Sequence, residues 1–540
     1  MKQRVLLASN RGPVSYHFGA DGTLTGRRGG GGLISGVTSG LAGMTAESEV
    51  TWVCAPFSDA DRAAARRQDA GDAADGGNAT DSGDAPDSGD AAEAGDVALP
   101  AGLSGPAGVR VRMLDIAPDT FDRAYNNVAN SILWFVHHLL FDTPNQPQFG
   151  LEFRRDWQSY VAYNEAFAAA VADEARADEA RVPVRALIQD YHLSLAPRML
   201  RQRLAPRLAP RLAPRLAQRP GGTADLGIAH FSHTPWAPPD YYRMLPDEVG
   251  RAVLAGILGA DHAGFHAARW AGAFLDCCEA ILGAQVIRSQ APGAAQAGWV
   301  LYDGHATEVA VHPLGIDAAA LRARAGAADV RDHIAALSQA ARGRKLIVRV
   351  DRTELSKNIV RGLAAYRELL ATRPEWHGRV VHLAFAYPSR SAVPEYRAYT
   401  ELVERTARQI AEQFRTPDWE PVILEVRDDY ARSLAACTVA DVLLVNPIRD
   451  GMNLVAQEGP VLSRDGCALV LSREAGAAAT LGPNALLVNP YDVSETAAAL
   501  HQALAMPDDE RRRRSAALAA TAEASPPARW LGDQLAALDR

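Results

Sequence analysis

Long apolar runs are missing from this chain of 540 residues. Its longest apolar stretches have about the length of one strand, whereas a membrane-spanning helix needs roughly 20 apolar residues in a row. The apolar segment 5–8 near the N-terminus is also too short for a signal peptide. We therefore expect a cytoplasmic protein with no membrane partner.

Cysteine is scarce as well. The five cysteines are an odd number, and no two of them form a Cys-x-x-Cys pair. This pattern argues against a disulfide framework and against a zinc site, and it fits a reducing compartment. The two histidines His230 and His233 are followed by no third ligand at a suitable spacing, so we expect no metal site.

Two segments lack the residues that a folded core needs. Residues 69–96 hold nine acidic residues and no Lys or Arg, and these nine acids exceed the whole net charge of −8. We expect this Ala-, Gly-, Asp- and Ser-rich segment to be disordered. Residues 203–219 repeat Arg-Leu-Ala-Pro, and a proline every fourth residue excludes a regular helix. The repeat could form an anion-binding patch, but it has no interleaved aromatic residues; we therefore expect an exposed loop and no nucleic-acid partner.

The rest of the chain alternates short apolar segments with longer amphipathic ones. The apolar segments predict strands at 4–8, 51–55, 109–114, 185–189, 226–231, 309–313, 345–350, 379–385, 421–426, 441–445, 467–471 and 485–488. The amphipathic segments predict helices at 126–141, 157–175, 250–282, 358–371 and 394–414. This alternation is typical of an α/β protein with doubly wound parallel sheets.

The length of the chain and a break in this pattern indicate more than one domain. The segment Val311–Asp317 closes the first half and a new strand-turn-helix unit begins at Lys345, so a boundary is expected within 318–344. We assign residues 1–325 to an N-terminal Rossmann-like domain, 326–520 to a C-terminal one and 521–540 to a tail for which a helix is expected. Ligands of open α/β sheets bind beyond the carboxyl ends of the strands, so functional residues should follow strands.

The segment Arg449–Glu458 has this placement. It directly follows the apolar run Val442–Val445, and its Asp-Gly-Met-Asn sequence predicts a tight turn before a helix that begins near Leu454. The free N–H groups of a helix N-terminus bind anions, above all phosphate. Glu458 lies one turn inside this helix, where its carboxylate could accept hydrogen bonds from the vicinal hydroxyls of a sugar. The segment therefore predicts a nucleotide-sugar site.

Three more motifs with polar residues follow predicted strands. Ser9–Pro13 precedes the glycine run 29–32, whose backbone could approach a ligand closely; a flexible loop is the alternative. Asp190 could bind sugar hydroxyls or cap the next helix. His233, in His-Thr-Pro-Trp, is placed to contact a sugar directly.

Basic residues follow two strands of the second half. Arg352 and Lys357 could converge on one diphosphate, with a bidentate fork and a point charge, and could stabilise a leaving diphosphate without a metal. The alternative is an exposed pair, or an ion pair with Glu354 or Asp351. Arg390 fits the phosphate of an acceptor, with a structural salt bridge as the alternative.

The motifs of this chain and their order along the sequence resemble those of the trehalose-6-phosphate synthases, over about residues 4 to 505. They are Ser-Asn-Arg-Gly-Pro with the glycine run, Asp-Tyr-His-Leu, His-Thr-Pro-Trp, Asp-Arg-x-x-x-x-Lys, Pro-Ser-Arg and Arg-Asp-Gly-Met-Asn-Leu-Val-Ala-x-Glu. The resemblance implies a GT-B fold, in which an acceptor-binding N-terminal domain faces a nucleotide-sugar-binding C-terminal domain across a central cleft. It also implies retaining transfer of glucose from UDP- or GDP-glucose to glucose 6-phosphate, with no metal or other cofactor. The oligomeric state stays open, with a homo-oligomer as one option.

The resemblance also assigns roles to individual residues. Four residues match catalytic positions: His233, Arg352, Lys357 and Asp450. Besides Arg352, Lys357 and Asp450, the residues that match the donor site are Gly31, Gly32, Leu454, Val455, Ala456, Gln457 and Glu458. The residues that match the glucose 6-phosphate site are Arg11, Tyr125, Trp134, Asp190 and Arg390.

The chain departs from the family pattern at three places. Gln189 replaces a histidine, residues 352–358 read Arg-Thr-Glu-Leu-Ser-Lys-Asn instead of Arg-Leu-Asp-Tyr-x-Lys-Gly, and residues 459–461 read Gly-Pro-Val instead of Tyr-Val-Ala. These changes leave the base of the donor and the acceptor open. The alternatives are a glucosylglycerol-phosphate synthase, a pseudo-glycosyltransferase of the validoxylamine-phosphate type, or a catalytically silent sugar-phosphate sensor. The presence of Arg352, Lys357 and Glu458 argues against the sensor.

Overall fold

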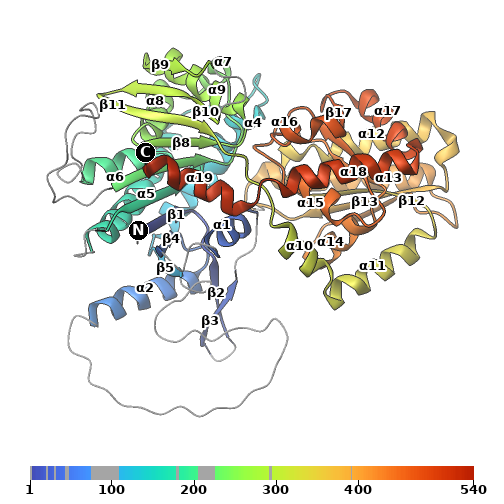
Figure 1. The fold of residues 1–540 in the computed structure, drawn as a ribbon, viewed down its shortest axis with the longest axis horizontal. Coiled ribbons are helices and arrows are strands. Elements are labelled where there is room, and N and C mark those ends of the chain that lie inside the picture. Colours follow the sequence, from blue (N-terminus) through green and yellow to red (C-terminus); the bar gives the residue numbers. More distant parts are fainter. Residues whose placement is uncertain are drawn as a thin grey trace, which may run out of the picture.

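The computed structural model describes residues 3–19, 22–28, 32–42, 48–74, 109–177, 182–204, 226–290, 295–390 and 392–539. These residues form two lobes, each built around a sheet that is flanked by helices (Figure 1). Of the two low-complexity segments, residues 75–96 and 205–219 lie outside the described residues. Among the residues that the structure describes, no helix combines the length and apolarity needed to cross a membrane.

The first lobe contains a nine-stranded sheet in the order β5-β4-β1-β6-β7-β8-β11-β10-β9. Adjacent strands from β5 to β11 are parallel, whereas β10 pairs antiparallel with both β11 and β9. A separate hairpin, β2–β3, follows β1. The bounds of the strands are β1 Gln3–Ser9, β2 Val14–Phe18, β3 Leu24–Arg28, β4 Ser48–Cys54, β5 Val109–Met113, β6 Val184–Gln189, β7 Leu226–Ser232, β8 His262–Phe265, β9 Gln285–Arg288, β10 Gln296–Tyr302 and β11 His305–Val311.

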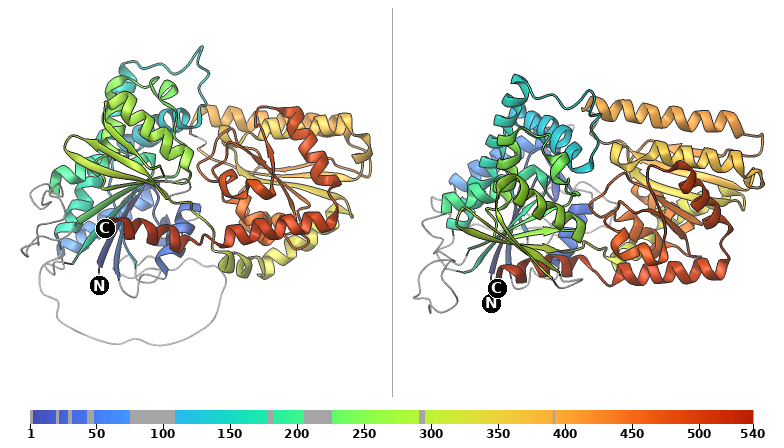
Figure 2. Two further views of the ribbon diagram at one scale, coloured as in Figure 1. Left: turned by 45° about the horizontal axis from the view of Figure 1, so that its top comes forward. Right: turned by 90° about the horizontal axis from the view of Figure 1, so that it is seen from above.

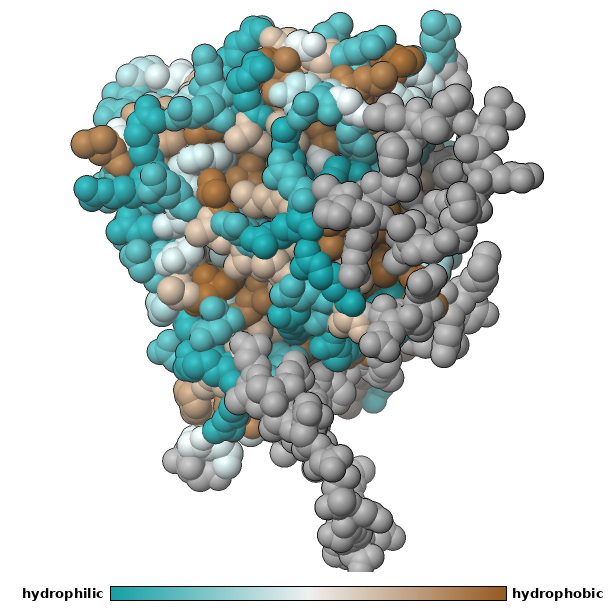
Figure 3. Space-filling model, turned by 90° about the vertical axis from the view of Figure 1, so that its left-hand side faces the viewer, coloured by the Kyte–Doolittle hydropathy of each residue, from teal (hydrophilic) through white to brown (hydrophobic). Residues whose placement is uncertain are grey.

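The helices of this lobe cover the sheet and contribute to its core. Their bounds are α1 Gly32–Ala42, α2 Asp59–Ala74, α3 Pro118–Asp122, a π-helix Arg123–Leu133, α4 Trp134–His138, α5 Leu151–Arg176, α6 Ala196–Leu204, α7 Pro239–Tyr242, α8 Asp247–Ile257, α9 Ala268–Cys277 and a second π-helix Cys278–Leu282. The outer face of the lobe, turned away from the second lobe, intersperses polar with apolar residues (Figure 3).

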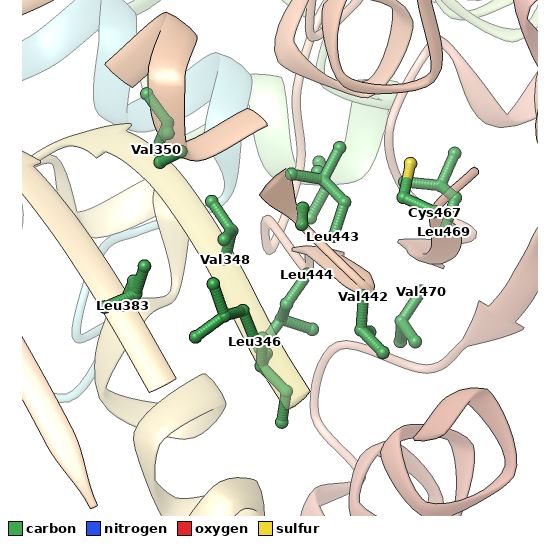
Figure 4. Packing of buried hydrophobic residues seen from close by; sticks show 14 of the residues in the cluster. Leu346, Val348, Val350, Leu383, Val442, Leu443, Leu444, Cys467, Leu469 and Val470 are labelled. Carbon is green, nitrogen blue, oxygen red and sulfur yellow. The ribbon is translucent and has the colours of Figure 1, made fainter. Parts of the chain in front are cut away.

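The second lobe contains a six-stranded parallel sheet in the order β14-β13-β12-β15-β16-β17. The strands are β12 Lys345–Arg352, β13 Val380–Tyr387, β14 Val422–Glu425, β15 Val442–Val445, β16 Ala468–Ser472 and β17 Leu486–Val488. Side chains of β12, β15 and β16 fill the core around this sheet (Figure 4). The strand order reverses between β12 and β15, and ligands of doubly wound sheets bind at such a switch point.

The helices of the second lobe lie on both sides of this sheet (Figure 1). Their bounds are α10 Ala318–Ala325, α11 Ala328–Ala341, α12 Ile359–Thr372, α13 Pro394–Phe414, α14 Tyr430–Val439, α15 Val455–Leu462, α16 Ala478–Leu481, α17 Val493–Ala505 and α18 Asp508–Glu523. Leu321 of α10 packs into the core of this lobe, so the boundary between the two cores falls before α10 rather than at residue 325.

The chain crosses from one lobe to the other twice. The first crossing is the linker around Leu314, after β11, and the second lies between α18 and the last helix, α19 Pro527–Asp539. α19 returns to the first lobe (Figure 2). Its Trp530 and Leu531 belong to a buried cluster with apolar residues of β1 and α1. The segment 521–540 therefore contributes to both lobes.

Each expected strand overlaps an observed strand, but two predictions about secondary structure are wrong, and some observed strands were not predicted. A single helix over 250–282 is interrupted by the short buried strand β8, whose apolar sequence also continues the helical pattern. Disorder does not begin at residue 69, because the alanine-rich helix α2 continues to residue 74. The edge strands β9 and β10 were not expected; the Asp303-Gly304 turn between β10 and β11, with positive φ at both residues, is the signal that predicts such a hairpin.

Candidate functional site

The central pair of the site joins the two strands at the switch point. Lys357 ends the short turn after β12, and its Nζ donates to Asp450 Oδ2 at 2.5 Å, in the turn after β15. Burial opposes the charge on Lys357, but Asp450, Asp351 and Glu354 raise its pKa above the ordinary value. Burial likewise opposes the charge on Asp450, and Lys357 lowers its pKa. Both side chains are therefore charged.

The turn from Asp450 to Asn453 is closed by the side chain of Asn453. Its Nδ2 donates to Asp450 Oδ2 at 3.0 Å, and its Oδ1 accepts from the backbone N of Ala456 at 3.2 Å. Asn453 adopts a positive φ of 83°, which asparagine tolerates better than most residues. These bonds fix the carboxylate of Asp450 in the turn before α15, where the sequence predicted a tight turn ahead of a helix.

Two expected donor-site residues of α15 have different surroundings. Gln457 is buried and its Nε2 donates to the backbone O of Leu314 at 3.1 Å, so its side chain ties α15 to the linker between the lobes. Glu458 is half-buried, and its carboxylate forms no hydrogen bond or ion pair with the residues that the structure describes. Burial alone raises the pKa of Glu458 to about 7.

This raised pKa predicts a pH-dependent effect of Glu458→Gln on stability. The carboxyl group ionises near 4.5 when solvated but near 7 in the folded protein, so the wild type loses stability as pH rises from 4.5 to 7. The variant avoids this loss. The quantity to compare is the free energy of unfolding of the variant minus that of the wild type. We expect this difference to be larger at pH 8 than at pH 5, by an amount on the order of 1 kcal/mol once solvent screening is allowed for.

Urea denaturation of both proteins at pH 5 and pH 8 measures this difference. Replacement of an exposed carboxylate on α13, Glu401→Gln, is the control for the loss of one negative charge. A Glu458→Gln offset of equal size at the two pH values would contradict the prediction.

Arg352 is the last residue of β12, and its side chain is 55% exposed. Its Nη1 lies 3.0 Å from Glu354 Oε1, so the ion pair that the sequence offered as an alternative is present. About half of the Arg352 side chain nevertheless remains open to solvent. Arg352 can therefore bind an anion while Glu354 holds it in place.

Arg390 connects the two lobes. It lies in the loop after β13 with φ of 47°, and its guanidinium carbon is 4.7 Å from the centre of the Trp134 ring of the first lobe. Its Nη2 donates to the hydroxyl of Tyr191, also of the first lobe, at 3.1 Å, and its Nη1 donates to that of Tyr396 at 2.5 Å. Two expected acceptor-site residues, Arg390 and Trp134, are thus in contact.

Asp190 and His233 lie together at the carboxyl ends of β6 and β7. Asp190 Oδ1 accepts from the backbone N of His233 at 3.1 Å. Burial raises the pKa of Asp190 to about 6, although backbone hydrogen bonds from Tyr191 and His233 oppose the rise. Burial also lowers the pKa of His233 well below the ordinary value, so its imidazole is neutral.

The imidazole of His233 is held from both sides. Its Nε2 lies 2.9 Å from Gln189 Oε1 and its Nδ1 lies 3.2 Å from His266 Nε2. Gln189, which departs from the family pattern, therefore orients the histidine that was expected in the site.

The remaining expected residues lie on the first lobe. Arg11 is exposed, with its guanidinium carbon 4.7 Å from the centre of the Phe57 ring, and Phe57 packs edge-on against Tyr125 with ring centres 5.3 Å apart. Gly32 is the first residue of α1. Gly31 lies outside the described residues.

The turn after β15 also presses against the first lobe. Trp270 Nε1 donates to the backbone O of Gly451 at 3.0 Å, and Arg449 Nη2 donates to the backbone O of Trp236 at 3.2 Å. The sequence did not single out Trp270 or His266, because their contacts join distant parts of the chain and no local motif surrounds them. The site is thus built from both lobes.

The sequence of this chain is similar to those of known proteins. A family model described as glycosyltransferase family 20 matches residues 101–540. The alpha,alpha-trehalose-phosphate synthase [UDP-forming] of Schizosaccharomyces pombe is 32% identical over 395 residues, which cover 73% of this chain and 70% of that protein. The corresponding synthase 2 of Aspergillus niger is 34% identical over 393 residues, which cover 72% of this chain and 74% of that protein.

The fold has solved counterparts as well. The crystal structure of an alpha,alpha-trehalose-phosphate synthase (UDP-forming) from Burkholderia vietnamiensis matches with a TM-score of 0.74 and 27% identity, over 99% of each chain. This likeness confirms the expected GT-B arrangement of two α/β lobes. The chain belongs to glycosyltransferase family 20, together with the trehalose-phosphate synthases, and is a glycosyltransferase.

Proposed function

We propose that the protein transfers glucose from UDP-glucose to glucose 6-phosphate with retention of configuration, giving α,α-trehalose 6-phosphate and UDP. The observation that carries the proposal is that two sets of cationic side chains, one for the donor and one for the acceptor, lie at the junction of the lobes. Lys357 and Arg352 lie beside the N-terminus of α15, and Arg390 lies against Trp134 and Tyr191 of the first lobe. The UDP-forming activity in the names of the relatives supports UDP as the leaving group.

The donor is proposed to bind on the second lobe. The N–H groups of Leu454 and Val455 at the start of α15 and the two cations Arg352 and Lys357 suit a diphosphate. Glu458, which has no partner among the described residues, is available to the hydroxyls of the ribose. Asp450 is fixed by Lys357 and Asn453 where it can accept from hydroxyls of the transferred glucose.

The acceptor is proposed to bind between the lobes. Arg390 and Arg11 would take its phosphate, and the aromatic residues Tyr125 and Trp134 would pack on the sugar. Asp190 would accept from a sugar hydroxyl.

In the proposed reaction the C1–O bond to the diphosphate breaks as the bond from C1 to the acceptor oxygen forms on the same face. The acceptor's proton passes to the leaving diphosphate oxygen, so no protein base is needed. Arg352 and Lys357 stabilise the negative charge that develops on the diphosphate. Because both are fixed cations, they provide this stabilisation without a metal or other cofactor. The neutral His233 contacts the transferred sugar.

A panel of two donors and two acceptors tests this proposal. We expect kcat/KM to be highest for UDP-glucose with glucose 6-phosphate, in a comparison that includes GDP-glucose and glycerol 3-phosphate, assayed with and without a chelator. Preference for glycerol 3-phosphate would indicate a glucosylglycerol-phosphate synthase instead. Binding of both substrates without turnover would indicate a sugar-phosphate sensor.

A further inference from the structure

A fully buried carboxylate lies between the proposed donor and acceptor cations. The side chain of Glu354 is 0% exposed, and its Oε1 lies 3.0 Å from Arg352 Nη1 and 4.0 Å from Arg390 Nη2. Ser389 Oγ donates to the same oxygen at 3.0 Å. One carboxylate oxygen therefore faces both guanidinium groups.

The topology of the sheet explains this arrangement. β12 and β13 are parallel neighbours, and Arg352 at the end of β12 pairs with Tyr387 at the end of β13. Glu354 follows the first of these strand ends and Arg390 follows the second. Both arginines thus leave the sheet at the same edge, where their like charges would repel each other without a carboxylate between them.

Glu354 is ionised over the whole physiological range of pH. Burial opposes its charge, but Arg352, Arg390 and Lys357 together hold the pKa of Glu354 near 2. Its other oxygen, Oε2, is buried without a hydrogen-bond partner among the described residues. A buried carboxylate oxygen without a partner costs stability, and a residue that served the fold alone would be expected to satisfy both oxygens.

We propose that Glu354 is a positioning residue for both substrates. It is the shared counter-ion that fixes Arg352 for the diphosphate of the donor and Arg390 for the phosphate of the acceptor. The proposal rests on the proposed function, because it takes the two arginines as phosphate ligands. It extends that function by placing a single carboxylate in control of two substrate sites.

The charge of Glu354 makes the proposal testable through the sign of an effect. A carboxylate beside two phosphate sites repels both ligands, so removal of its charge alone would strengthen binding. Loss of its positioning role would weaken binding, because each guanidinium would lose its fixed orientation. The isosteric change Glu354→Gln removes the charge and keeps the size of the side chain, and it therefore separates the two effects.

The experiment is isothermal titration of UDP and, separately, of glucose 6-phosphate into the wild type and Glu354→Gln. We expect the Kd of each ligand to rise at least roughly tenfold in Glu354→Gln, because Arg352 and Arg390 each lose the anionic partner that fixes the guanidinium. Glu354→Asp keeps the charge and matches the family pattern at this position, so it should retain more of the affinity for both ligands than Glu354→Gln.

The control is Asp441→Asn, which removes a carboxylate that pairs with Lys345 Nζ at 2.8 Å, before the start of β15 in the same lobe. It should leave both Kd values unchanged, and thermal melts show whether each variant is folded. Unchanged or tighter binding of either ligand to folded Glu354→Gln would overturn the shared role. If Glu354→Gln does not fold, a rise of both Kd values in Glu354→Asp, whose carboxylate is one methylene shorter, would support the role, and unchanged affinities or loss of only one ligand would overturn it. Wild-type protein that binds neither ligand would contradict the proposed function itself.

Discussion

Lys357→Ala is expected to lower kcat by about 10²- to 10³-fold, the usual effect of removing one group that stabilises developing charge in a transition state. Lys357 Nζ is the partner of Asp450 at 2.5 Å, and the proposed reaction builds negative charge on the diphosphate beside it. The variant removes this cation and also leaves Asp450 as a buried carboxylate without its ion pair. Steady-state kinetics with saturating UDP-glucose and glucose 6-phosphate measure the change.

The chain offers a matched control on the same strand. Lys345, the first residue of β12, pairs with Asp441 at 2.8 Å, so Lys345→Ala breaks the same kind of ion pair at the opposite end of the strand. We expect kcat to be unchanged in Lys345→Ala, and circular dichroism melts should show both variants folded. A folded Lys357→Ala protein with near-normal kcat would remove Lys357 from the catalytic assignment.

The fold was largely predictable because its central strands are buried on both faces. Such strands appear in the sequence as short continuous apolar runs, and β12 and β15 are of this kind. β8 escaped prediction because a four-residue buried strand between two helices has the same composition as the helices around it. The lobe boundary was misplaced since α10 follows the linker directly and only its packing against α14 and α15 assigns it to the second lobe.

The site was predictable to the extent that its residues follow strands. The ion pair of Lys357 and Asp450 and the contact of Arg390 with Trp134 join residues that were singled out for their place in the sequence. The positions of these residues follow from the rule that parallel strands present their carboxyl ends at one edge. Which of these residues contact one another could not be predicted from the sequence, because the contacts depend on how far each loop extends from that edge.

Contacts between residues far apart in the sequence, both within the first lobe and across the junction of the lobes, could not be predicted. Trp270 and Gly451 are 181 positions apart, and His266 reaches His233 only because β7 and β8 are neighbours in the sheet. No local pattern marks either contact. The junction at Gly451 can be seen only in the structure.

Gly451→Ala is expected to lower kcat by about 10²-fold, because a displacement near 1 Å at a reacting centre has effects of this size. A Cβ atom at Gly451 would lie 1.8 Å from the backbone O of His233, and backbone atoms cannot move aside as the end of a flexible side chain can. Either the turn that holds Asp450 must shift, or the two lobes must move apart. Both changes separate groups that the proposed reaction needs together.

A control glycine lies on the helix that supports this junction. Gly272 is two residues from Trp270 on α9, and a Cβ atom there would meet no atom within 4 Å. Gly272→Ala should therefore leave kcat unchanged and stabilise the protein by about 0.5–1 kcal/mol, since alanine loses less backbone entropy than glycine in a helix. Steady-state kinetics and urea denaturation of both variants separate a general effect of added methyl groups from the predicted clash. Wild-type kcat in Gly451→Ala would contradict the prediction, because it would mean that the turn can move without disturbing Asp450. Turnover would then not require the close approach of Gly451 to the backbone of His233.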